Sequence, residues 1–212
     1  METHTARPRL IAFVLFGCLL GLTVEAHYKL FAFFNPKGLG AAIVLYPIIL
    51  LGFFGLGRLV DRVAKTRLRA DLTLWFLTAA IGLAIEWTLL GNSPMQNPNA
   101  SQLGMLCLWT GFAFFPRLLA RSDDAEAWVR RRIWAIYGTY AVIGTTLGLT
   151  LPASGAKSVI LIYLPVLAYG FANVVVLNAL VRPGAARPLP SPQASSSPTA
   201  VGELGSTHST PR

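Results

Sequence analysis

The residues from 38 to 57 read GLGAAIVLYPIILLGFFGLG and carry no charged side chain. The following residues, RLVDRVAKTRLRAD (58–71), hold five basic and two acidic side chains. The next run, LTLWFLTAAIGLAIEWTLL (72–90), is apolar again, with Glu86 as its one charged residue. Each apolar run is close to the ~20 residues that a helix needs to cross a ~30 Å hydrocarbon layer. This stretch therefore predicts two membrane-spanning helices joined by a short basic loop.

Apolar segments of this length recur along the first 182 of the 212 residues, in which hydrophobic residues are abundant. We read six of them: Leu10 to Ala26, Gly38 to Gly57, Leu72 to Leu90, Leu103 to Leu119, Ile133 to Leu151 and Ser158 to Val181. With 54% hydrophobic residues, the chain has more apolar side chains than a soluble domain of this size can bury. We therefore expect an all-α, polytopic membrane protein whose residues 1–182 form a bundle of six transmembrane helices.

The basic residues predict how the helices are oriented. Fifteen of the 18 Lys and Arg residues lie before the first apolar segment, in the second and fourth gaps, or after the last segment. The other three are Lys29, Lys37 and Lys157. Because basic loops stay in the cytoplasm, both termini should be cytoplasmic, in the inner (cytoplasmic) membrane. This arrangement and contact with anionic headgroups explain the net charge of +9, so we expect a lipid bilayer and no nucleic acid as partner.

Both ends of the chain allow further predictions. Arg7 and Arg9, the apolar run after them and Val24-Glu25-Ala26 also fit a signal peptide, and cleavage after Ala26 would leave five spans. The apolar residues from Tyr28 to Phe34 favour a helix that continues instead. Residues 183–212 are dominated by Pro, Ser, Ala and Thr, which predicts a disordered cytoplasmic tail.

Small and amide side chains predict how the helices pack. Two pairs of glycines spaced four apart should each open one helix face to a close neighbour; they are Gly17 with Gly21 and Gly144 with Gly148. Packing within the bundle is the favoured interpretation, and a homo-oligomer or a partner membrane subunit is the alternative. Asn173 and Asn178 should form hydrogen bonds between helices.

Glu86 is the most unusual residue of the apolar segments. It lies four residues before Leu90, about 6 Å below the outer end of its helix at 1.5 Å per residue. Trp75, Ala79, Gly82 and Glu86 share one helix face, and the small residues allow another helix to approach. Because a carboxylate is costly in a membrane, this face should point into the bundle.

Other polar side chains should lie at the same side of the membrane. Glu25 and Lys29 can pair across one helical turn, and His27 or Lys29 could instead reach Glu86. We therefore predict an outer-leaflet polar pocket formed by Glu25, His27, Lys29, Glu86, Asn92, Gln96 and Asn97. The alternative is that these are interface residues and that Glu86 only ties helices together.

Motifs for known membrane chemistry are missing from the sequence. There is no HExxH motif, no pair of histidines for a haem and no phosphate-binding glycine loop, so we expect no metal, no cofactor and no ATP-driven transport. Three functions remain. The protein could handle a small solute or lipid at the polar pocket, or it could be a non-catalytic assembly or accessory subunit. The third is an intramembrane enzyme that acts on a lipid or isoprenoid with Glu86 as general acid. An enzymatic role is the least favoured.

Overall fold

The computed structural model describes residues 9–98, 101–121 and 127–181, and all regular structure in these residues is helical. The helices are α1 (Leu10–Ala26), η1 (His27–Ala32), α2 (Pro36–Val63), α3 (Arg67–Thr88), α4 (Gln102–Ala113), α5 (Phe115–Leu119), α6 (Ala127–Thr150) and α7 (Gly155–Leu180). The prediction of an all-α bundle is confirmed. The tail predicted to be disordered, residues 183–212, lies outside the described residues.

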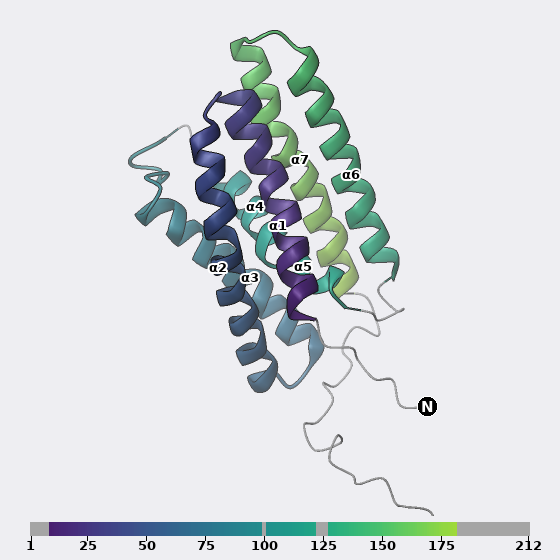
Figure 1. The fold of residues 1–212 in the computed structure, drawn as a ribbon. Coiled ribbons are helices and arrows are strands. Elements are labelled where there is room, and N and C mark those ends of the chain that lie inside the picture. Colours follow the sequence, from purple (N-terminus) through teal and green to yellow (C-terminus); the bar gives the residue numbers. More distant parts are fainter. Residues whose placement is uncertain (1–8, 99–100, 122–126, 182–212) are drawn as a thin grey trace, which may run out of the picture.

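The long helices run up and down in one bundle (Figure 1). The turn between α2 and α3, the N-terminal start of α1 and the start of α6 lie at one end, which we call the basic end. The connections from η1 to α2, from α3 to α4 and from α6 to α7 lie at the other, which we call the polar-loop end. α4 and α5 fill the centre of the bundle, and their residues are the most buried of all the candidate spans.

Within the described residues, five segments are long and apolar enough to cross a membrane: α1 with η1, α2, α3, α4 with α5, and α7. α6 has 24 residues, but its Tyr, Thr and Gly residues lower its hydropathy, so the sixth span stays a prediction.

Several helices continue beyond the apolar segments that predicted them. α2 extends to Val63 and α3 begins at Arg67, where the Thr66 side chain accepts a hydrogen bond from the Arg69 N–H.

Two helices are interrupted, and proline explains one interruption. α4 ends at Ala113 and α5 starts at Phe115, because Pro116 has no N–H to donate to the preceding turn. α1 continues past Ala26 as the π-helix η1, so the chain stays helical through the apolar residues that follow Glu25. This wider turn distributes the side chains of the segment over several neighbouring helices.

The predicted glycine contacts occur within the bundle. A Cβ atom on Gly17 would lie 2.4 Å from Leu50, and one on Gly144 would lie 2.6 Å from the ring of His27. A Cβ atom on Gly148 would likewise overlap the Phe31 side chain. These glycines therefore allow α2 to approach α1 and η1 to approach α6, as expected for small residues in membrane bundles.

Asn173 forms interhelical hydrogen bonds as predicted, whereas Asn178 forms none with the residues that the structure describes. The Asn173 Oδ1 accepts from Trp75 Nε1 at 2.7 Å and from Thr110 Oγ1 at 2.9 Å, and its Nδ2 donates to the Cys107 carbonyl at 3.2 Å. The buried amide thus joins α3, α4 and α7. The prediction for Asn178 is wrong, because its side chain is exposed on the outside of α7.

Candidate functional site

Glu86 lies in the last turn of α3 and is half-buried, with its carboxylate turned toward α4. Its Oε1 accepts a hydrogen bond from Trp109 Nε1 at 3.0 Å, and its Oε2 accepts one from Asn92 Nδ2 at 2.7 Å. Gly82 makes this contact possible, because a Cβ atom there would lie 2.1 Å from the Trp109 side chain. The prediction that this face of α3 points into the bundle is confirmed.

The loop after α3 is ordered around Asn92. Gly91 has a φ of +68°, which lets the chain reverse so that the Asn92 N–H donates to the backbone carbonyl of Glu86 at 2.9 Å. The Asn92 Oδ1 accepts from Asn97 Nδ2 at 3.3 Å, and its carbonyl accepts from Gln102 Nε2 at 3.1 Å. The loop thus fixes the amide that holds Glu86.

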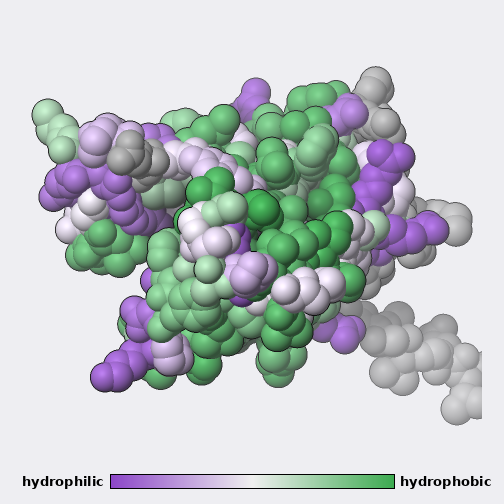
Figure 2. Space-filling view, turned by 90° about the horizontal axis from the view of Figure 1, so that it is seen from above, coloured by the Kyte–Doolittle hydropathy of each residue, from purple (hydrophilic) through white to green (hydrophobic). Residues whose placement is uncertain are grey.

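Of the other loop residues in the predicted pocket, Gln96 bonds to Ser93 and, among the described residues, not to the carboxylate. Its Oε1 accepts from Ser93 Oγ at 3.0 Å, and its backbone N–H donates to the same hydroxyl. Hydrophilic surface gathers over this loop, at the left of the bundle seen from the polar-loop end, while much of the remaining face is hydrophobic (Figure 2).

Glu25, near the end of α1, is held in a similar way from α2. The Tyr46 hydroxyl donates to Glu25 Oε1 at 2.8 Å. The Lys29 Nζ lies 4.0 Å from Glu25 Oε2, which is a weak ion pair because the two side chains are 34% and 20% exposed. The predicted pairing of Glu25 with Lys29 is therefore present, and a tyrosine adds the stronger contact.

Aromatic side chains connect the two carboxylates. The ring centroids of Tyr46 and Phe112 lie 4.4 Å apart, and those of Phe112 and Trp109 lie 5.6 Å apart in an edge-to-face arrangement. Because Tyr46 holds Glu25 and Trp109 holds Glu86, the five residues form one continuous unit. We call it the acidic aromatic cluster: Glu25, Tyr46, Phe112, Trp109 and Glu86.

His27, predicted to belong to the same pocket, lies against another helix. It is 2% exposed in the turn after α1, and its ring nitrogens bond to the Tyr140 hydroxyl at 2.6 Å and the Thr145 hydroxyl at 3.1 Å, both on α6. We expected His27 or Lys29 to reach Glu86, but the hydrogen-bond partners of Glu86 are Trp109 and Asn92. Each residue turns an α-helix by about 100°, so His27 points roughly 200° away from Glu25 and faces α6, whereas Glu25 faces α2.

A buried cluster of charged residues lies at the basic end. Asp71 is fully buried and accepts from Arg117 Nε at 2.9 Å and from Arg121 Nη1 and Nη2 at 2.8 and 2.7 Å. Arg117 also forms a two-pronged pair with Asp61, at 3.0 and 2.6 Å. The ends of α2, α3 and α5 are therefore tied together by charge-assisted hydrogen bonds.

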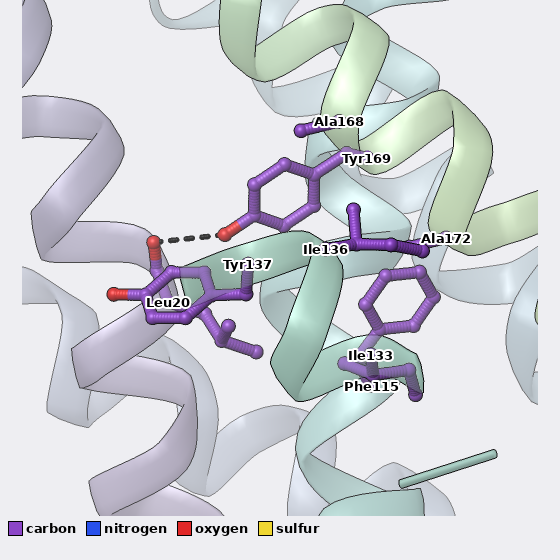
Figure 3. A pocket seen from close by; sticks show the side chains of 8 residues that line it. All are labelled: Leu20, Phe115, Ile133, Ile136, Tyr137, Ala168, Tyr169 and Ala172. Atoms are coloured by element: carbon purple, nitrogen blue, oxygen red, sulfur yellow. Dashed lines mark hydrogen bonds between the residues drawn. The ribbon is translucent and has the colours of Figure 1, made fainter. Parts of the chain in front are cut away.

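An apolar pocket lies between α1, α5, α6 and α7 (Figure 3). Its lining residues are Leu20, Phe115, Ile133, Ile136, Tyr137, Ala168, Tyr169 and Ala172. The Tyr169 hydroxyl does not offer a free polar group there, because it donates to the Leu20 carbonyl at 3.0 Å. The volume of about 10 Å³ is at the lower limit for a single water molecule, so this pocket does not hold a substrate.

Sequence reasoning missed the partners that hold the carboxylates. Tyr46 and Trp109 look like ordinary apolar residues of their segments, and only the packing of α1 on α2 and of α3 on α4 brings them to Glu25 and Glu86. The sequence did contain a feature that pointed to the buried charged cluster. Asp71 is one of only nine acidic residues and stands next to an apolar segment.

Comparison with known proteins does not place this chain in a family. No protein-family model, no curated protein and no solved structure matches it. In the part of the chain that the structure describes, no group of three or more His, Cys, Asp or Glu side chains is positioned to hold a metal ion.

Proposed function

We propose that this membrane protein binds a positively charged small solute, or a lipid with a positively charged headgroup, at the acidic aromatic cluster. The observation that carries the proposal is the pairing of two half-buried carboxylates with a continuous row of packed aromatic rings. With the basic end in the cytoplasm, as the loop charges predict, the ligand reaches the cluster from the outer side of the membrane.

The electrostatics of the cluster favour a cation. Glu86 is held by an indole and an amide, which are neutral donors, and among the described residues it forms no ion pair with a basic side chain. Glu25 has a tyrosine hydroxyl and one distant lysine. The hydrogen bonds keep both carboxylates oriented without neutralising them. A carboxylate at this depth is costly, and a bound cation would offset the cost.

The aromatic rings add a second attraction. The faces of Trp and Tyr rings attract organic cations with about 0.5–2 kcal/mol, most strongly where water is excluded. Trp109 is buried and Tyr46 is half-buried beside the carboxylates. Carboxylates with aromatic rings suit an alkylammonium group better than a metal ion, which would require more oxygen ligands. The preferred ligand class is therefore a primary to quaternary amine.

The test is a titration of the purified protein with ammonium ions of increasing size, from methylammonium to choline, followed by Trp fluorescence and calorimetry. Glu25→Gln and Glu86→Gln keep side-chain size and hydrogen bonding but remove the charge. Each should weaken binding about tenfold or more, which corresponds to a loss of about 1.4 kcal/mol. The matched control Glu203→Gln removes one charge from the C-terminal segment and should bind like the wild type.

Two results would overturn the proposal. In the first, the folded wild-type protein binds none of the cations. In the second, the Gln variants at Glu25 and Glu86 bind them as well as the control does. Circular dichroism and thermal unfolding of every variant show whether a loss of binding reflects the site or the fold.

A further inference from the structure

Four basic side chains are exposed around the turn between α2 and α3, at the basic end of the bundle. They are Arg58, Arg62, Lys65 and Arg69, which we call the basic turn. None of them forms an ion pair with an acidic side chain in the described residues. The turn therefore presents four positive charges that no acidic side chain in the described part of the chain neutralises.

The buried charged cluster causes this surplus of charge. In the sequence, Asp61 is four residues before Lys65, a spacing that allows an ion pair on a helix surface. In the structure, Asp61 is turned toward Arg117, and Asp71 is buried beneath Arg117 and Arg121. Both acids of this segment are thus paired with buried arginines, and among the described residues neither of them neutralises an exposed base of the turn.

Apolar side chains lie next to these charges. Leu59 is 56% exposed and Val63 is 77% exposed in the last turns of α2, beside Arg58 and Arg62 on the same helix. The Arg58 guanidinium lies 5.5 Å from the centre of the Phe54 ring, which directs the arginine along the helix. The surface therefore combines hydrocarbon contacts with phosphate-binding groups in one place.

We propose that the basic turn is a binding site for an anionic phospholipid, with the phosphate at the arginines and the acyl chains along the end of α2. The occupant follows from charge complementarity and from the position of the turn beside a membrane-spanning segment. Guanidinium groups bind phosphate oxygens in a planar, two-pronged arrangement, and three of the four side chains are Arg. A free phosphate would leave Leu59 and Val63 uncovered.

The expected size of the effect can be estimated per charge. A basic residue near an anionic membrane surface contributes an attraction equivalent to about fivefold in affinity. Removal of two charges should therefore weaken binding of the lipid by roughly 25-fold if both contact it. Diffuse attraction by the whole basic end would instead give similar losses wherever the charges are removed.

The full-length protein in a neutral detergent is titrated with phosphatidylglycerol and, in a separate series, with phosphatidylcholine of the same acyl chains. The number of bound lipid molecules is measured by native mass spectrometry. The variant Arg62→Gln/Arg69→Gln removes two charges of the basic turn. The matched control Arg131→Gln/Arg132→Gln removes two exposed charges at the start of α6, which lies on another side of the basic end (Figure 1). Soluble glycerol phosphate is added as competitor in a parallel series.

We expect the wild type to prefer phosphatidylglycerol, the basic-turn variant to lose roughly 25-fold in its affinity, and the control to change by less than about twofold. Equal losses in the two variants would show diffuse attraction and overturn the proposal. No preference of the wild type for the anionic lipid would overturn it as well. Displacement of the lipid by millimolar glycerol phosphate would identify a site for free phosphate instead. All four side chains are exposed, so the variants should fold, which thermal unfolding checks.

Discussion

Replacement of Asp71 by Asn should destabilise the protein strongly. Asp71 is fully buried and accepts three guanidinium hydrogen bonds of 2.7 to 2.9 Å, while Arg117 and Arg121 are only 5% and 6% exposed. Removing one partner of a buried ion pair costs about 3–5 kcal/mol, because the remaining charge is left without compensation. Since the Asn oxygen still accepts one hydrogen bond, we expect about 3 kcal/mol.

Asp61→Asn is the matched control, because Asp61 also pairs with Arg117. Its side chain is 29% exposed, and in its absence Arg117 keeps Asp71. We expect a loss of about 1 kcal/mol or less, as for exposed pairs. The assay is equilibrium unfolding in mixed micelles with increasing mole fraction of a denaturing detergent, followed by circular dichroism. The free energies of unfolding are compared at the same micelle composition.

A second variant tests the cause of the loss. Addition of Arg121→Met to Asp71→Asn removes the uncompensated charge, so the double variant should recover part of the stability. A free energy of unfolding of Asp71→Asn within about 0.5 kcal/mol of the wild-type value, or a larger loss in Asp61→Asn, would refute the stabilising role of the buried carboxylate. Additive effects of Asp71→Asn and Arg121→Met would show that the two side chains are not coupled.

Two further predictions concern packing within the bundle, and both are measured by the same unfolding assay. Gly82→Ala places a methyl group against Trp109 and should cost about 1–3 kcal/mol of unfolding free energy. Gly138→Ala, with open space around it, should be neutral or slightly stabilising. Equal effects of the two changes would contradict the close contact at Gly82. Asn173→Leu leaves the Trp75 indole N–H without its acceptor and should cost about 1–3 kcal/mol, whereas Asn178→Leu on the exposed face should change little. A harmless Asn173→Leu would show that these hydrogen bonds contribute no net stability.

The candidate site was predictable only in part. The cost of a carboxylate in an apolar helix pointed to Glu86, and the small side chains of Ala79 and Gly82 correctly predicted that its face is packed. The grouping of His27 with Glu86 came from the assumption that residues at the same depth meet. Depth in the membrane follows from sequence position, but the neighbour that each helix face meets depends on the packing: His27 faces α6, whereas Glu86 faces α4.

The sequence by itself determined the helical class and the position of most helices, because a chain in hydrocarbon must satisfy its backbone hydrogen bonds within each apolar segment. That requirement is local, so it can be read from the length of each run. Only the tertiary structure decided which polar side chains meet. Tyr46 with Glu25, Trp109 with Glu86 and Arg117 with Asp71 are contacts between different helices, set by close approach at glycines and by the break at Pro116. Such contacts depend on how the helices are rotated and packed, which no single segment specifies.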